Sequence, residues 1–334
     1  MAELTTVADD EAVVHDGHEV RRYEDLRPDS HHVIEGFAFH TLPRWGERLA
    51  TVATVNDVHF GETVCGLMEG LPEGPVFRSA PGSDPYPEMM NRGAISEISA
   101  IEPDAVVVKG DLTCDGLDEE YAAFLAAYAP AFGDRLLHVR GNHDAYRHQA
   151  FAPSGPQRVD VDGLTVALLD TVHPGHSGGA VSTDQLEWLA DLANEADRPV
   201  LVMGHHHVWS PDSSTRPDTY FGIRPDDSER LVQVVAGQPR IIGYAAGHTH
   251  RNRVRRIAAT GHRPWIEVAC VKDYPGTWAE YRVFDGGVLQ VHRRISTPEA
   301  MAWSEQTRDM FAGLYAGYAF GSLEDRCLAL PAAT

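Results

Sequence analysis

The sequence predicts an α/β protein, because apolar runs typical of strands alternate with segments of helical periodicity along most of its 334 residues. Several runs, such as residues 105–109 and 200–203, are uninterrupted, as in strands that are buried on both faces. Polar residues with oxygen or imidazole donors follow five of these runs directly. Ligands of α/β proteins bind at the carboxyl ends of strands, so the pattern also predicts where a site lies.

The first elements predicted within the alternating region are a strand at 50–55 and a helix at about 88–101. The helix is expected to end at Glu102-Pro103, because the residue before a proline disfavours helical geometry. Residues 117–128 carry apolar and aromatic side chains at helical spacing, which predicts a second helix whose aromatic face packs in the core.

The second half of the chain continues the alternation. Ser182 and Gln185 resemble a capping box at the start of an amphipathic helix. Asp285-Gly286-Gly287 is a strong hairpin signal between two late strands. Apolar runs or helical spacing predict the remaining elements at residues 136–140, 164–169, 182–191, 229–236, 241–246, 265–271, 280–285 and 288–294.

The chain divides into three parts. Residues 1–45 are polar, acidic and rich in histidine, and we expect an N-terminal extension that is partly strand or loose. Residues 46–295 hold the alternating elements and form the main domain. Residues 296–334 are predicted to be a helical, aromatic segment that serves as a cap or a dimer contact. The loop at 61–87 is rich in glycine and proline, and a loop of this length is usually functional or mobile.

Charge and cysteine content exclude some classes of protein. The formal net charge is −21, which argues against a nucleic-acid-binding surface, because such surfaces carry basic stripes. The four cysteines form no CxxC pair and are expected to be reduced thiols. We find no signal-peptide pattern and no apolar run of about 20 residues, so we expect a cytoplasmic protein without a membrane span.

Five short polar clusters carry the chemistry. They are Asp57-x-His59, Gly110-Asp111, Gly141-Asn142-His143-Asp144, Gly204-His205-His206-His207 and Gly247-His248-Thr249-His250. Such carboxylate, amide and imidazole donors suit two divalent transition-metal ions. Asp111 has two carboxylate oxygens and can bridge two ions, while His143 beside Asn142 can remain free for acid–base chemistry. Adjacent side chains cannot all face one ion, so one member of the histidine triplet is expected to bind and the others to line the pocket.

In order and spacing, these clusters resemble the signature of the calcineurin-like metallophosphoesterase superfamily over about residues 50–295. The run at 168–189, which leads into the histidine triplet, is similar to the bacterial cyclic-nucleotide phosphodiesterase branch. That branch also contains glycerophosphodiesterases. It usually has proline after the histidine run, whereas Val208 and Trp209 stand here, which bears on the shape of the substrate side.

The resemblance implies a four-layer α/β/β/α sandwich, in which two mixed β-sheets face each other with helices outside. It also implies two divalent ions, Mn, Fe or Zn, held by two sets of residues that share Asp111. The first set is Asp57, His59, Asp111 and His250, and the second is Asp111, Asn142, His205 and His248. In the same resemblance His143 is the acid–base or charge-stabilising residue, and Asp144 orients it as the second catalytic residue.

The function implied is hydrolysis of a small phosphodiester, a cyclic nucleotide or a glycerophosphodiester, by a hydroxide that bridges the two metal ions. A phosphomonoesterase of the same fold is the close alternative. A catalytically retired metal-binding or scaffold protein is the alternative from another class. The expected partner is a small phosphate ester rather than nucleic acid, and a homodimer stays open.

Overall fold

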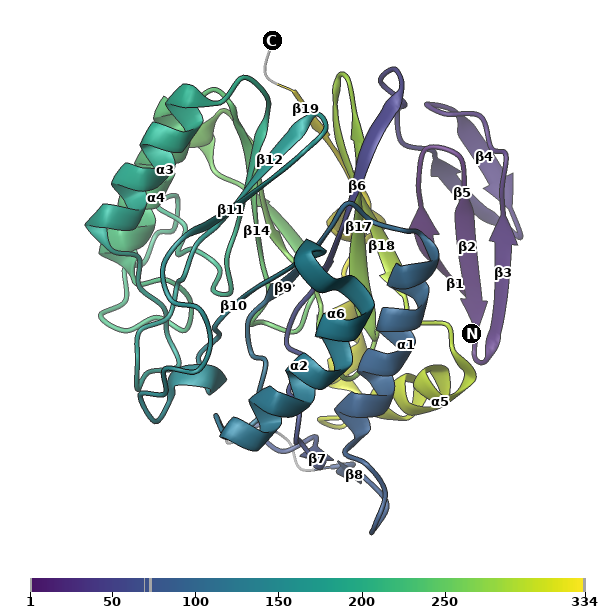
Figure 1. Cartoon of the computed structure of the whole chain (residues 1–334). Coiled ribbons are helices and arrows are strands. Elements are labelled where there is room, and N and C mark those ends of the chain that lie inside the picture. Colours follow the sequence, from purple (N-terminus) through teal and green to yellow (C-terminus); the bar gives the residue numbers. More distant parts are fainter. Residues whose placement is uncertain (1, 69, 72–73, 333–334) are drawn as a thin grey trace.

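The computed structural model describes residues 2–68, 70–71 and 74–332, and two six-stranded sheets that face each other form its centre (Figure 1). Sheet one contains, in spatial order, β10 (Leu136–Val139), β9 (Ala105–Lys109), β6 (Arg48–Val55), β17 (Thr277–Phe284), β18 (Gly287–Arg294) and β19 (Leu328–Pro331). Sheet two contains β11 (Gln157–Val161), β12 (Leu164–Leu168), β13 (Val200–Met203), β14 (Ile241–Ala246), β16 (Pro264–Glu267) and β15 (Arg253–Arg256). Strands β10, β9 and β6 run parallel, as do the four central strands of sheet two, and the other pairings in both sheets are antiparallel.

Helices complete four layers. The outer face of sheet one is covered by α1 (Tyr86–Ala100) and α2 (Asp118–Phe132), and that of sheet two by α3 (Thr183–Glu195) and α4 (Pro225–Gly237) (Figure 1). Buried apolar side chains from both sheets fill the space between them and form the central core. Each sheet therefore has a core on both faces, which explains the uninterrupted apolar runs of its central strands. The expected α/β/β/α sandwich is confirmed.

Five short strands make up much of the described N-terminal segment. The strands β1 (Ala2–Val7), β2 (Ala12–Asp16) and β3 (Glu19–Tyr23) form an antiparallel sheet, and β4 (His31–Ile34) pairs with β5 (Phe37–His40). This N-terminal sheet lies beside β18 at the antiparallel side of sheet one (Figure 1). The described part of the extension is thus built onto the main domain.

Buried ion pairs fasten the N-terminal sheet to sheet one. Glu11 lies 2.5 Å from Arg282 and also contacts Arg293. Arg282 further contacts Asp9 at 2.6 Å and Glu280 at 2.9 Å. A buried charge that loses its partner strongly destabilises a protein. Any other position of the N-terminal sheet would break these pairs, so they fix its position on sheet one. A cavity of about 560 Å³ remains between the N-terminal sheet and sheet one, and these charged side chains line part of it.

The C-terminal segment is helical as expected over α5 (Pro298–Thr307), α6 (Leu314–Phe320) and α7 (Leu323–Arg326). It then ends in β19, a strand that the sequence did not lead us to predict. In β19, Leu328 and Leu330 enter the core between the sheets, and the strand pairs with β18. Three apolar residues in a run are too few to predict a strand. The strand forms because its backbone pairs with β18 in the folded protein.

The other predicted elements are confirmed with boundaries that shift by a few residues. The predicted strands 105–109, 200–203 and 241–246 coincide with β9, β13 and β14. Strands β11 and β15 were not predicted, because they lie at the edges of sheet two and are half exposed. The long loop at 61–87 holds a short hairpin of β7 (Val64–Cys65) and β8 (Phe77–Arg78). In the described part of the chain, no helix has both the length and the hydrophobicity that crossing a bilayer requires.

Candidate metal centre

The five polar clusters meet where parallel strands of the two sheets end. Asp57 and His59 follow β6, and Asp111 follows β9, its neighbour in sheet one. The histidine triplet follows β13, and the last cluster follows β14, its neighbour in sheet two. Contacts between the sheets join these ends: the backbone N–H of His248 donates to the Asp57 carboxylate at 3.0 Å, and His205 Nδ1 lies 2.8 Å from the Lys109 carbonyl oxygen.

One group of donors consists of Asp57, His59, Asp111 and His250, whose ligand atoms all lie within 4.8 Å of one another. His59 Nε2 lies 3.4 Å from Asp111 Oδ2, and His250 Nε2 lies 3.4 Å from Asp57 Oδ1. Two donors that each lie about 2.1 Å from one ion are separated by about 3.0–3.4 Å. The spacing of this first group therefore fits a bound transition-metal ion.

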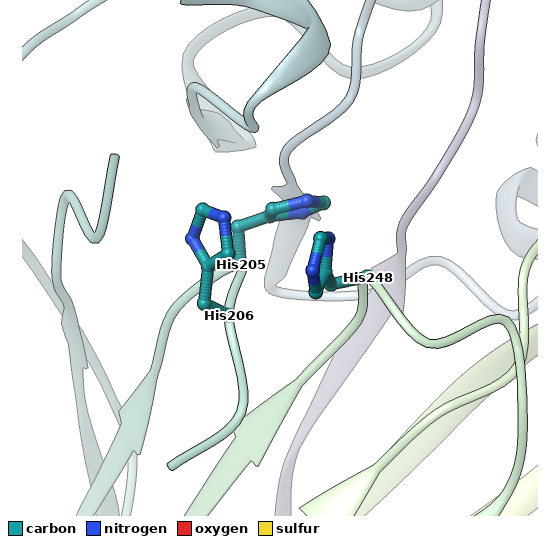
Figure 2. Close-up of side chains that lie close together, drawn as sticks. All are labelled: His205, His206 and His248. Atoms are coloured by element: carbon teal, nitrogen blue, oxygen red, sulfur yellow. The ribbon is translucent and has the colours of Figure 1, made fainter. Parts of the chain in front are cut away.

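A second group consists of His205, His206 and His248, whose imidazole rings converge from the ends of β13 and β14 (Figure 2). His205 Nε2 lies 3.4 Å from Asp111 Oδ1 and 3.0 Å from Asn142 Oδ1. The structure thus brings Asn142 to the same place. Because the two oxygens of Asp111 face imidazoles of different groups, this one carboxylate lies between both.

The three side chains of the histidine triplet have different partners, because adjacent residues cannot all face one point. His205 faces Asp111, whereas His207 turns away and lies 3.0 Å from the Tyr220 hydroxyl. His206 Nδ1 lies 2.9 Å from the Thr171 hydroxyl, and its buried Nε2 has no hydrogen-bond partner among the described residues. An orphaned buried nitrogen beside two other imidazoles fits a nearby cation, so His206 joins the candidates that the sequence left open.

Hydrogen bonds to backbone carbonyls orient the histidines. A carbonyl oxygen can only accept, so His205 Nδ1 donates to Lys109, and Nε2 is left for the centre. His248 Nε2 lies 2.7 Å from the Phe221 carbonyl oxygen, which leaves Nδ1 toward the other imidazoles. Partners of this kind fix the tautomer and ring orientation of histidines that bind metals.

Strained backbone holds five of the seven expected ligands. The angle φ is positive at Asp57 (53°), His59 (46°), Asp111 (50°), His248 (69°) and His250 (53°), which is uncommon for residues other than glycine. Such strain persists only where the surrounding structure enforces it, and it concentrates at functional sites. Strand geometry does not continue through Asp57-x-His59: β6 ends at residue 55, and both residues have left-handed backbone.

The glycine that precedes Asn142 is required by close packing. A Cβ atom on Gly141 would lie 2.1 Å from Asp111 Oδ1 and 2.2 Å from the Asp111 backbone nitrogen. Any larger residue would therefore push the shared carboxylate out of place. This is a steric reason for glycine at the start of the third cluster.

Burial and charge divide the donors of the centre into neutral and charged groups. Burial would raise the pKa of Asp57 and Asp111, but nearby imidazoles hold both below their usual range. Burial lowers the pKa of His59 to about 4 and that of His248 to about 3, so both rings are neutral with a free lone pair. Burial would also lower the pKa of His205, but Asp111 raises it to about 9. The carboxylates thus favour positive charge at the centre, which a divalent cation could supply.

His143 lies at the centre, but the expected role of Asp144 needs correction. His143 Nδ1 lies 2.6 Å from the Cys114 carbonyl oxygen, and its ring centroid is 4.5 Å from that of His59. The Asp144 carboxylate does not orient this ring. It accepts hydrogen bonds from the backbone of Leu112, Thr113 and Gly141, and from the Thr113 hydroxyl. Asp144 therefore ties the Asp111 loop to the His143 turn, and a backbone carbonyl orients His143.

Several residues near the centre were not predicted. Glu62 Oε2 lies 3.2 Å from His59 Nδ1, and Lys272 lies 2.8 Å from Glu62. Cys270 and Asp273 have ligand atoms within 4.8 Å of His250. From α6, the Tyr315 hydroxyl donates to Asp273 at 2.5 Å and the Tyr318 hydroxyl donates to the Thr249 carbonyl at 2.9 Å. These residues come from loops and from the C-terminal segment, where the sequence shows no local pattern of metal ligands.

Comparisons with known proteins place the chain among metal-dependent phosphoesterases. The family model described as calcineurin-like phosphoesterase matches residues 50–252. A probable cyclic nucleotide phosphodiesterase of Rhodococcus erythropolis is 30% identical over 172 residues, which cover 48% of this chain and 56% of that protein. A glycerophosphodiester phosphodiesterase of Enterobacter lignolyticus is 30% identical over 175 residues, which cover 48% of this chain and 61% of that protein.

These alignments span little more than half the length of each relative. A solved structure, a dimetal phosphatase from Danio rerio, superposes with a TM-score of 0.56 at 14% identity and covers 75% of this chain and 98% of the other. At this identity the likeness concerns the fold alone, and it agrees with the layered arrangement of two mixed sheets.

Proposed function

Because this chain belongs to the calcineurin-like phosphoesterase family, we propose that it is a metal-dependent hydrolase of small phosphodiesters. Relatives named as cyclic nucleotide and glycerophosphodiester phosphodiesterases support the diester class. The formal net charge of −21 favours a small ester over nucleic acid as the substrate.

One observation carries the proposal of a binuclear centre: the position of Asp111 between two groups of donors. Its Oδ2 faces His59 and its Oδ1 faces His205, each at 3.4 Å. A carboxylate that bridges two cations has this disposition. The first ion would be held by Asp57, His59, Asp111 and His250, and the second by Asp111, Asn142, His205 and His248, with Mn, Fe or Zn as the metals.

Such a pair of ions, when bound, lowers the pKa of a coordinated water and binds phosphoryl oxygens. Around it, the protein's own residues perform three tasks. The carboxylates of Asp57 and Asp111 supply negative charge that holds the cations. Backbone carbonyls and Glu62 turn the histidines toward them. The buried surroundings of both carboxylates exclude bulk water, which strengthens each of these interactions.

His143 is proposed to act on the substrate rather than to hold metal. Its Nδ1 donates to the Cys114 carbonyl, so Nε2 is the atom available to a substrate oxygen. The side chain is half-buried, so part of it remains accessible to solvent. As an imidazolium, it can donate the Nε2 proton to the leaving oxygen or stabilise charge on it.

Metal content and a substrate panel on the same protein test the proposal. Protein loaded with Mn or Zn is expected to hold two ions per chain by elemental analysis. It should hydrolyse bis-p-nitrophenyl phosphate, cyclic AMP or glycerophosphocholine in preference to p-nitrophenyl phosphate. Preference for p-nitrophenyl phosphate would instead identify a phosphomonoesterase. Two bound ions with no turnover of any ester would identify the metal-binding or scaffold alternative.

A further inference from the structure

Phe221 places an aromatic ring at the edge of the candidate metal centre. Its ring stacks on the imidazole of His248 with centroids 4.0 Å apart and an interplanar angle of 29°. Its backbone carbonyl accepts the hydrogen bond from His248 Nε2 at 2.7 Å. The residue is nevertheless 52% exposed. One face of the phenyl ring is therefore covered by an expected metal ligand, while much of the side chain remains open.

The loop that carries Phe221 is tied down on both sides. The Tyr220 hydroxyl lies 3.0 Å from His207 Nε2. A Cβ atom on Gly222 would lie 2.2 Å from the His207 carbonyl oxygen, and the Ile223 N–H donates to that same oxygen at 2.8 Å. An exposed phenyl ring on an anchored backbone is preorganised for a ligand, since little conformational freedom is lost on binding.

Exposed aromatic side chains lie beside the second donor group. Tyr146, which is 37% exposed, accepts a hydrogen bond from Asn142 at 2.6 Å, and its ring centroid is 5.0 Å from that of His143. On the first group's side Lys272 and Asp273 are buried, while His250 is half-buried and Tyr318 is 45% exposed. A substrate whose phosphate lies at the centre can extend toward Tyr146 and Phe221, which present exposed aromatic surface beside the second donor group.

We propose that Phe221 is a stacking platform for the nucleobase of a cyclic nucleotide, which makes it a specificity-determining residue. This inference rests on the proposed function and chooses between the two diester classes that it leaves open. A nucleobase offers a planar π-face to the ring, and such stacking on aromatic side chains is a general mode of base recognition. A glycerophosphodiester has no ring to stack, so exposed phenyl surface at this place would serve it poorly.

Kinetic comparison of two substrates tests the platform. In Phe221→Ala, kcat/KM for cyclic AMP should fall about 10- to 100-fold, and this loss should be several-fold larger than that for glycerophosphoethanolamine. Phe221→Trp keeps a ring and should remain within about threefold of wild type, whereas Phe221→Leu keeps apolar area without a ring and should resemble the alanine variant. Val33→Ala, on the exposed hairpin of the N-terminal segment, is the matched surface control. Equal losses on both substrates, or a Phe221→Leu variant that retains turnover of cyclic AMP, would overturn the assignment.

Equilibrium binding separates this inference from the proposed function. Wild-type protein should bind AMP about tenfold more tightly than ribose 5-phosphate, which lacks only the base, and Phe221→Ala should remove that difference. Titration calorimetry measures both ligands without any turnover. If the wild type hydrolyses no diester, the proposed function fails, but the ratio of the two affinities still decides the role of Phe221. An unchanged ratio in Phe221→Ala overturns the stacking platform even if the enzyme is an active phosphodiesterase.

Discussion

The ammonium group of Lys272 lies 2.8 Å from the carboxylate of Glu62, and both side chains are largely shielded from solvent. The other neighbour of this carboxylate is an expected metal ligand, since Glu62 Oε2 lies 3.2 Å from His59 Nδ1. Lys272 also lies 3.4 Å from Asp273, whose other oxygen accepts hydrogen bonds from Cys270 and Tyr315. Glu62, Lys272 and Asp273 thus form a continuous buried network that contacts the first donor group at His59.

We predict that Glu62→Gln weakens metal binding at the first group without unfolding the protein. The carboxylate behind a metal-binding histidine holds the ring and raises its basicity, and its loss typically costs 10- to 100-fold in metal affinity. Competition with a chelator measures this affinity directly, and Glu187→Gln, on the exposed face of α3, is the control. An unchanged affinity in Glu62→Gln would show that Glu62 and Lys272 form a structural pair only.

The second prediction concerns Asp111, the carboxylate between the two groups. Asp111→Asn removes the charge that the two proposed ions would share. Such ions would supply several kcal/mol of transition-state stabilisation, so activity should fall by at least about 100-fold. Cys114→Ser, three residues on, should lose far less, because burial raises the pKa of this thiol to about 12 and keeps it neutral. Steady-state kinetics and metal analysis of both variants check this. Comparable losses would mean that the bridging carboxylate is misassigned.

Most of the candidate site could be predicted from the sequence because its donors follow strands that are themselves easy to recognise. Strand β9 is a run of buried valines, and Asp111 comes two residues later. Glu62 and Lys272 could not be found in this way, because they are separated by 210 residues and meet only in the folded protein. The role of Asp144 was misread for a related reason: three of its four hydrogen bonds come from backbone amides, which leave no trace in the side-chain pattern.

At the start of α3, a tertiary contact replaces one of the two local hydrogen bonds that the sequence pattern predicts. Ser182 accepts a hydrogen bond from the Gln185 backbone at 3.3 Å, as the sequence predicts. The Gln185 side chain does not return to Ser182 as a capping box would require. It pairs with the backbone of Asp170 instead, at 2.9 and 2.8 Å, and thereby joins α3 to the end of β12.

The third prediction is a loss of stability in acid that depends on Glu280. Burial would raise the pKa of this carboxyl, but Arg293 and Arg282 lower it to about 2 in the folded protein. The unfolded chain, with an ordinary value near 4.5, binds the proton first as the pH falls. The contribution of Glu280 to stability is therefore complete above about pH 5 and is lost between about pH 4.5 and 2, by at most about 3 kcal/mol.

Thermal unfolding at several pH values measures this effect. Glu280→Gln should be less stable than wild type at pH 7, because Arg282 and Arg293 lose a buried partner. Its Tm should fall less steeply than that of wild type below pH 5. Glu299→Gln, on the exposed surface of α5, should follow the wild-type curve. Parallel curves for wild type and Glu280→Gln would contradict the assigned pKa.

The last prediction concerns His143, which adjoins the expected ligand Asn142 and is oriented by the Cys114 carbonyl. Since its Nδ1 is engaged by protein, Nε2 is free for the substrate and His143→Ala should retain both metal ions. Turnover should nevertheless fall on the order of 10²- to 10⁴-fold, as for a positioned acid or base. The fall should be smaller for an aryl diester than for an alkyl diester, because p-nitrophenolate leaves without protonation.

Rates on both diesters and metal content should be measured on one preparation of His143→Ala, with Asp144→Asn for comparison. Asp144 accepts four hydrogen bonds from the two loops, so this variant should lose stability, by about 1–3 kcal/mol, without a changed dependence on the leaving group. If the metal content of His143→Ala falls in step with its activity, His143 is a ligand and the proposed role is wrong. If the ions stay and both diesters lose rate equally, His143 stabilises charge on the phosphoryl group rather than protonating the leaving oxygen.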